Sequence, residues 1–156
     1  MWALLILFSL TAAAGAFLVS QESAQQVALQ AQDVSLSRNL AMYRSLVVGY
    51  VQAHGVVPGT VPDSALAFPA WYERHPAWTN TVLADGTVVV YPTGAVMPSL
   101  AAELVGFTQG SMLAGEARVR AGGTQVYLYS PQGGDSGIAL PSTLRAGTPV
   151  WLARIE

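Results

Sequence analysis

An unbroken apolar run opens the chain. Residues 2–19 (WALLILFSLTAAAGAFLV) are all uncharged and mostly apolar. As a helix this run would reach about 27 Å, close to the roughly 30 Å of hydrocarbon in a bilayer. The pattern predicts a transmembrane anchor over residues 1–20, followed by a single domain of ordinary size.

A cleaved secretory signal is the alternative interpretation of the same run. Ala14-Gly15-Ala16 would pass as a small-residue cleavage site, but a signal peptide also needs a basic segment before its apolar core. The first basic side chain in this sequence is Arg38. The uncleaved anchor is therefore favoured, and it predicts a single-pass inner-membrane protein whose C-terminal domain is periplasmic.

The next segment has the spacing of a long amphipathic helix. Residues 21–55 contain no Pro, and Gly occurs only at Gly49 and Gly55. Apolar side chains recur at intervals of three and four, which is the period of one helix face; they are Leu36, Leu40, Tyr43, Val47 and Tyr50. We expect this face to be buried against the domain's own sheet, with a partner helix as the alternative.

Residues 56–156 have the pattern of a small domain with an antiparallel sheet. Four Pro and several aromatic residues, Trp71 and Tyr72 among them, predict an ordered loop over residues 56–79. Asp85-Gly86 and Gly122-Gly123 each separate two apolar runs, which predicts two β-hairpins. A short helix is expected over residues 100–105, a flexible loop over 131–137, and a last strand over 149–155.

These elements predict an α+β fold with about five strands. Its parts are a transmembrane helix at residues 1–20, a long amphipathic helix at residues 21–55 packed on a small antiparallel sheet, and an α+β domain at residues 56–156. A long apolar helix joined to a sheet is pilin-like in outline.

Charge composition excludes several classes of partner. The chain has seven Arg, no Lys, nine acidic residues and a formal net charge of −2. It has no basic run of the kind that follows a phosphate backbone, so nucleic-acid binding is not expected. No glycine-rich phosphate-binding motif is present either.

Catalytic and metal-binding patterns are also missing from the sequence. There is no Cys, and His54 and His75 have no spacing that would bring them together as ligands. No serine-nucleophile motif occurs. A glycosidase needs a pair of carboxylates. Six carboxylates are candidates, and each is single and lies in or beside a turn, a helix start or a polar face; they are Asp63, Glu73, Asp85, Glu103, Glu116 and Asp135. We expect no enzyme activity, no cofactor, no metal and no small-molecule substrate.

The order of features resembles the PilM family of type IVB pilus biogenesis proteins, which are small proteins of thin, conjugative pili. The resemblance rests on an N-terminal span, a Gln/Ala-rich stretch, and Arg38-Asn-Leu-Ala-Met-Tyr-Arg44 leading into Pro62-Asp-Ser-Ala-Leu66. It implies an accessory protein of the bacterial envelope, and it brings no catalytic residues with it.

The functional hypothesis is a non-enzymatic, membrane-anchored component of type IV pilus biogenesis that contacts the inner membrane and other pilus assembly subunits. The alternative is a minor pilin or pseudopilin incorporated in the fibre. Aromatic and apolar side chains of the helix and the loop form the candidate partner interface; they are Leu36, Leu40, Tyr43, Val47, Tyr50, Trp71 and Tyr72.

Overall fold

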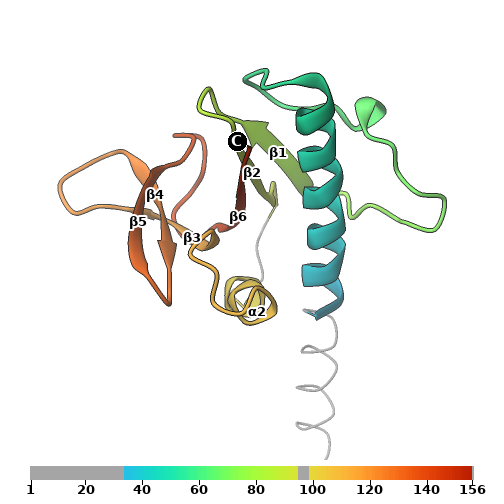
Figure 1. Ribbon diagram of the computed structural model, residues 1–156. Helices are drawn as coiled ribbons and strands as arrows, with labels where there is room; N and C mark the ends of the chain where they lie inside the picture. The colour runs from blue at the N-terminus through green and yellow to red at the C-terminus, as the bar shows by residue number, and fades with distance from the viewer. Residues whose placement is uncertain (1–33, 95–98, 156) are drawn as a thin grey trace, which may run out of the picture. The chain divides into compact units, whose positions relative to one another are not determined.

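Six antiparallel strands form the principal layer of the structure, a computed structural model that describes residues 34–94 and 99–155. The strands are β1 (Trp78–Val82), β2 (Thr87–Pro92), β3 (Ala114–Val119), β4 (Val126–Ser130), β5 (Gly134–Ala139) and β6 (Pro149–Arg154). Their order across the sheet is β1-β2-β6-β3-β4-β5. The last strand in sequence therefore joins the two hairpins (Figure 1).

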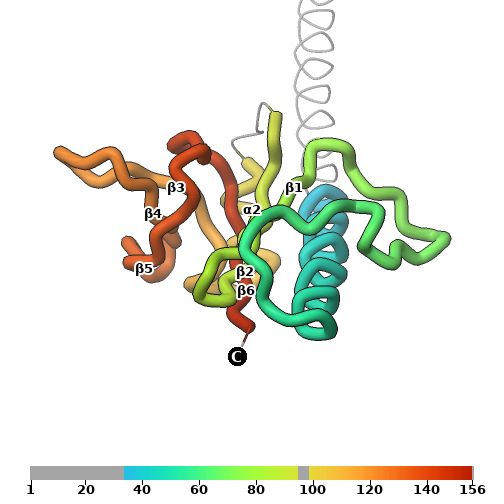
Figure 2. Tube along the Cα trace, turned by 90° about the horizontal axis from the view of Figure 1, so that it is seen from above, coloured from blue at the N-terminus to red at the C-terminus, as the bar shows by residue number. Residues whose placement is uncertain are grey.

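Within the described residues, two α-helices and a one-turn 3-10 helix, η1 (Asp63–Ala65), accompany the sheet. One α-helix covers residues 34–54, and the other, α2, runs Ser99–Phe107. Buried side chains of the 34–54 helix pack with alternate side chains of β1, β2 and β6 and with Leu100 and Leu104 of α2. Seen from above, the 34–54 helix lies at the β1 end, while β3, β4 and β5 extend away from it (Figure 2).

The two faces of the sheet carry separate hydrophobic cores. Val88 and Val90 of β2 join the core under the 34–54 helix, and Val89 between them joins the core on the opposite face. This alternation follows from the two-residue period of a strand. The second core is completed by Leu140 and Leu144, which lie in the connection between β5 and β6.

Several local predictions are confirmed. Both hairpins form, and Gly86 and Gly122 have the positive φ angles of 81° and 78° that their turns require. The 34–54 helix ends at Gly55, whose φ is 85° and whose N–H donates to the carbonyl of Val51 at 2.8 Å. The last strand and the short helix also occur, as β6 and α2.

The predicted fold class was wrong. The structure is built on a sheet of six strands instead of a long helix on a small sheet of about five. The error came from giving the helical period of residues 21–55 more weight than the strands. Each strand is only five or six residues long, so its signal in the sequence is short, yet together the strands make the central layer.

The predicted localisation needs the same correction. A transmembrane helix requires about 20 consecutive, mostly apolar residues. Within residues 34–94 and 99–155, neither helix combines the length and the apolar character that a bilayer crossing demands. A single-pass inner-membrane protein is therefore not supported. The predicted span at residues 2–19 lies outside the described residues.

The predicted loop over residues 131–137 was also wrong in part, because β5 begins inside it. Its Gly- and Ser-rich composition is typical of a loop. Backbone pairing with β4 needs no large side chain, however, and Ser136 Oγ adds a hydrogen bond to the carbonyl of Leu128 at 2.8 Å. At the sheet edge Asp135 accepts the N–H of Gly137 at 2.8 Å.

Candidate functional site

The seven predicted interface residues lie at different depths. Leu40, Tyr43 and Val47 are buried in the core between the 34–54 helix and the sheet. Leu36, Tyr50 and Tyr72 are partly buried against the same core. Trp71 is 75% exposed. The structure therefore brings six of the seven residues to one core and leaves Trp71 at the surface, out of that core.

A groove of about 700 Å³ lies beside Trp71, and we call it the Trp71 groove. Its walls come from the solvent-facing side of the 34–54 helix, from the loop at residues 71–73, and from Phe107 at the end of α2. The lining residues are Ser35, Arg38, Asn39, Ala41, Met42, Ser45, Trp71, Tyr72, Glu73 and Phe107. The surface is thus made of segments far apart in the sequence.

Local aromatic packing holds the loop that carries Trp71. The N–H of Tyr72 donates to the carbonyl of Pro69 at 2.9 Å, which closes a turn around Trp71. The Tyr72 ring stacks on Phe68 at a centroid distance of 5.7 Å and meets the edge of Trp71 at 6.2 Å. The turn therefore directs Trp71 outward while Tyr72 points back to the helix.

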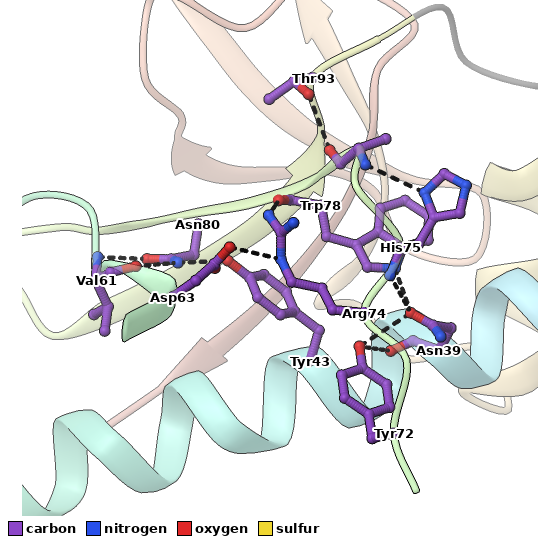
Figure 3. Close-up of polar contacts among 11 residues, drawn as sticks. Asn39, Tyr43, Val61, Asp63, Tyr72, Arg74, His75, Trp78, Asn80 and Thr93 are labelled. Carbon is purple, nitrogen blue, oxygen red and sulfur yellow. Dashed lines mark hydrogen bonds and ion pairs between the residues drawn. The ribbon is translucent and has the colours of Figure 1, made fainter. Parts of the chain in front are cut away.

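Asn39 joins this loop to the helix through its amide side chain (Figure 3). Its Oδ1 accepts hydrogen bonds from the Trp78 indole N–H at 2.8 Å, from the Tyr72 hydroxyl at 3.0 Å and from the His75 N–H at 3.2 Å. Its Nδ2 donates to the carbonyl of Glu73 at 2.8 Å. One side chain thus holds three loop residues and the first residue of β1, which makes the position of the loop well determined.

A second polar network supports the loop from inside (Figure 3). Asn80 Nδ2 donates to the Tyr43 hydroxyl at 2.8 Å and to the carbonyl of Val61 at 2.9 Å, and Asn80 Oδ1 accepts the Val61 N–H at 2.8 Å. Arg74 lies over the Tyr43 ring and pairs with Asp63 at 3.1 Å. Buried polar groups that are satisfied in this way specify one arrangement of the chain.

The two phenols in these networks stay protonated at physiological pH. Burial raises the pKa of Tyr43 above its ordinary value, and it raises the pKa of Tyr72 to about 12. Loss of the phenolic proton would place a charge in a poorly solvated site. Both hydroxyls therefore act as hydrogen-bonding groups that hold the structure together.

Beside the groove, Arg44 links the 34–54 helix to the central strand. Its Nε and Nη2 donate to the carbonyl of Leu152 at 2.9 and 2.6 Å, and its guanidinium lies 4.8 Å from the centre of the Trp151 ring. Burial lowers the pKa of Arg44. Trp151 in turn meets Phe107 edge to face at 5.9 Å. These contacts fix Phe107, and with it one wall of the groove.

Two charged side chains line the Trp71 groove and have no partner of opposite charge within residues 34–94 and 99–155. Arg38 on the helix and Glu73 on the loop are both exposed. No ion pair involves either of them among the described residues. The groove thus combines an exposed aromatic anchor with one available cation and one available anion.

A second surface, the Arg–Tyr ladder, lies on β3, β4 and β5 and consists of Glu116, Arg118, Arg120, Tyr127, Tyr129 and Asp135. Arg118 lies 3.7 Å from the Tyr129 ring centre and pairs with Glu116 at 2.5 Å. Arg120 lies 3.6 Å from the Tyr127 ring centre and pairs with Asp135 at 2.5 Å. Every charge of this ladder therefore has an intramolecular partner.

The described residues contain no metal-type cluster of three or more His, Cys, Asp or Glu side chains. His54 stacks on Tyr50 at 4.2 Å, and His75 lies 5.0 Å from Trp78. Asp85, one of the carboxylates considered above, accepts the N–H of Thr87 at 3.0 Å, and this bond lowers its pKa. These side chains are occupied by local structural contacts.

Sequence reasoning missed Asn39, Arg44 and the pairing within the ladder. Asn39 is not part of the apolar stripe predicted above, although it lies directly before Leu40 and four residues before Tyr43. A polar residue at the border of an apolar stripe was the available signal. For the ladder, the hairpin predicted at Gly122-Gly123 already pairs the two strands. What the sequence did not predict is that each Arg lies over a Tyr ring and pairs with a carboxylate.

Comparison with known proteins places the chain in a family. A crystal structure of a PilM protein from Escherichia coli B7A superposes with a TM-score of 0.55 at 19% identity, over 80% of this chain and 93% of that chain. The crystal structure of a PilM protein from Pseudomonas aeruginosa 2192 gives a TM-score of 0.43 at 26% identity, over 78% of this chain and 97% of that one. No curated protein matches the chain.

The likeness to the Escherichia coli protein shows a shared fold. The family is shown by the sequence itself, since the sequence model of the PilM family matches residues 7–152, nearly the whole chain. The resemblance predicted from the sequence is thereby confirmed. This chain belongs to the PilM family, which indicates a role in pilus biogenesis.

Proposed function

We propose that this chain is a non-enzymatic component of pilus biogenesis that contacts other pilus assembly subunits through the Trp71 groove. The observation that carries the proposal is the exposure of Trp71, 75%, on a loop that is itself held by the partly buried hydrogen bonds of Asn39. Trp is among the residues most enriched at the energetic centres of protein interfaces. An exposed Trp on a well-ordered loop has the character of an anchor for a partner.

Preorganisation of the loop supports this role. Ordering a loop during binding would subtract from the free energy of association. Here the Asn39 hydrogen bonds and the stacking of Tyr72 on Phe68 already order the turn that carries Trp71. The Trp71 side chain therefore meets a partner with little further loss of backbone entropy.

The non-enzymatic part of the proposal rests on what the reactive side chains already do. The two phenols with raised pKa values are hydrogen-bonded within the loop networks. The His54 ring stacks on Tyr50, and the His75 ring lies tilted against Trp78. A catalytic site needs a nucleophile or acid–base group converging with others on a cavity. The groove is lined by three aromatic rings, small side chains and two separate charges, and the hydroxyl of Tyr72 among them is bonded to Asn39.

The test replaces Trp71 in the organism that carries the gene and counts assembled pili. Trp71→Ala should reduce piliation at unchanged cellular level of the protein. The matched control is Val57→Ala, since Val57 is 70% exposed and lies outside the groove. Normal piliation in the Trp71→Ala strain would overturn the proposal. Mass spectrometry of purified fibres addresses the alternative prediction, incorporation of the chain into the pilus.

A further inference from the structure

We propose that the pilus assembly subunit that binds the Trp71 groove is a second copy of this chain, and that the two copies associate about a twofold axis. This inference rests on the proposed function, because it names the partner of the same surface. Three features of the groove carry it: its balanced charges, its exposed aromatic side chain and its small side chains on the helix.

The charges of the groove are self-complementary. In a twofold interface both copies present the same patch, so a residue i that contacts j is matched by j contacting i. A patch with charges of one sign would repel its own copy. The Trp71 groove carries one cation, Arg38, and one anion, Glu73, and neither belongs to an intramolecular ion pair among the described residues. Arg38 of each copy can therefore meet Glu73 of the other.

The apolar part of the groove is complementary to itself in the same way. Each copy offers an exposed Trp71 and a hollow of about 700 Å³ beside it, bordered by Met42 and by Phe107, which is 45% exposed. Two copies related by a twofold axis would bury two Trp71 side chains at once. Burial of about 150–250 Å² for each aromatic side chain would form the centre of the interface.

The helix side of the groove permits close approach of a second copy. Ser35, Ala41 and Ser45 line it, and all three side chains are short. Specific dimers bury roughly 800 Å² on each partner with about 20–30 residues. The ten residues that line the groove supply the centre of such an interface, so we expect association that depends on protein concentration.

The experiment measures the sedimentation velocity of the purified full chain over a wide concentration range. Wild-type protein should form a concentration-dependent dimer. Arg38→Glu and Glu73→Arg, each alone, should place like charges at both contacts and raise the dissociation constant at least about tenfold. The double variant Arg38→Glu/Glu73→Arg should recover the wild-type dissociation constant.

Mixing the two single variants gives the sharpest readout. In a heterodimer of Arg38→Glu and Glu73→Arg chains, both contacts across the twofold axis join opposite charges. The mixture should therefore dimerise with a dissociation constant close to that of the wild type, although each component alone associates at least about tenfold more weakly. This result would also demonstrate that both single variants are folded. Arg145→Glu is the matched control, because it makes the same charge change at an exposed site outside the groove and should leave the dimer unchanged.

Three results would overturn the inference: a wild-type chain that stays monomeric at every concentration, a dimer that ignores all the groove variants, or single variants that dissociate without recovery in the double variant and the mixture. Counting pili in the Trp71→Ala strain distinguishes failure of the dimer inference from failure of the proposed function. If the wild-type protein is monomeric and the Trp71→Ala strain loses its pili, only the twofold dimer is contradicted. If the charge-swapped variants dimerise as expected but the Trp71→Ala strain makes normal pili, only the proposed function is contradicted.

Discussion

The Trp71 groove and the Arg–Tyr ladder are built from the same kinds of residue but differ in how their charged side chains are paired. Both combine Arg, carboxylates and aromatic rings. In the ladder, Arg118 and Arg120 each lie over a Tyr ring and pair with a carboxylate. In the groove, Trp71 is 75% exposed, and Arg38 and Glu73 are exposed and form no ion pair with any residue that the structure describes. Composition alone therefore does not identify a binding surface.

Regular geometry explains the ladder. Glu116 and Arg118 of β3 lie opposite Tyr129 and Tyr127 of β4, so the side chains of the two strands meet on one face. The groove has no such regular neighbour, because a helix, a loop and the end of α2 meet there. At this junction Arg38 and Glu73 face outward, and a partner could form ion pairs with them.

The largest predicted loss of stability is at Gly115 of β3, where β3 lies close to the backbone of β4. Gly115→Ala would bring a Cβ into the backbone carbonyl oxygen of Tyr129, with the carbonyl carbon at 2.9 Å and Ser130 Cα at 3.0 Å. Backbone cannot rotate away as a side chain can, so we expect a loss of about 3 kcal/mol in the free energy of unfolding. Urea denaturation followed by circular dichroism measures it.

The control for this substitution is Gly49→Ala. Gly49 lies exposed in the 34–54 helix, and its added Cβ would meet nothing within 4 Å. Ala in place of Gly inside a helix should stabilise the protein by about 0.5–1 kcal/mol. If Gly115→Ala were as stable as wild type, the close approach of β3 and β4 described above would be contradicted.

A smaller loss is expected at the loop that carries Trp71. Asn39→Ala would leave the buried indole N–H of Trp78 and the N–H of His75 without their acceptor. An unsatisfied buried donor costs about 1–3 kcal/mol, so the free energy of unfolding should fall by about 2 kcal/mol. Amide hydrogen exchange at His75 should also become faster, since its N–H would no longer be bonded.

Ser45→Ala is the comparison for Asn39→Ala. Ser45 lies on the same helix, and its Oγ donates locally to the carbonyl of Met42 at 2.8 Å. Its loss should change the free energy of unfolding by no more than about 0.5 kcal/mol. Unchanged exchange at His75 in the Asn39→Ala protein would refute the role of Asn39 in ordering the groove.

The smallest effect concerns the exposed end of the ladder and its dependence on pH. The Arg120 guanidinium lowers the pKa of Asp135 to about 2. Because the folded-state pKa lies below the ordinary value of about 3.9, the pair's stabilisation is complete above that value and is lost as pH falls through about 2. Carboxyl chemical shifts followed by NMR titration should give this low pKa, and Arg120→Gln should return it toward the ordinary value.

The dependence of the Asp135 pKa on salt is a further test of this ion pair. Exposed charges are screened within about 10 Å at 0.1 M ionic strength, so added salt should move the pKa of Asp135 upward. A pKa of Asp135 that is the same with and without Arg120 would contradict the ladder geometry.

Local order could largely be predicted from the sequence, because short-range chemistry decides it. Asp85-Gly86 and Gly122-Gly123 require turns, and Gly55 ends the helix with a positive φ. The strand β5 could not be predicted in this way. Its Gly- and Ser-rich segment becomes a strand through backbone pairing with β4, and no alternation of apolar and polar side chains predicts that pairing.

The candidate site was predicted only in part for a related reason. Trp71 was included in the candidate interface, as were Leu40, Tyr43 and Val47, which are buried in the protein's own core. A helical stripe of apolar residues has the same spacing whether a sheet or a partner covers it. Only the packing of the chain distinguishes the two cases.

By itself the sequence determined the family, the turns, the end of the helix and the two-residue alternation of the strands, since each depends on residues close together in the chain. Tertiary structure alone decided the strand order with β6 between the hairpins, the hydrogen bonds of Asn39 and the exposure of Trp71. These features join residues tens of positions apart, and their energies come from contacts that exist only once the sheet and helix have packed.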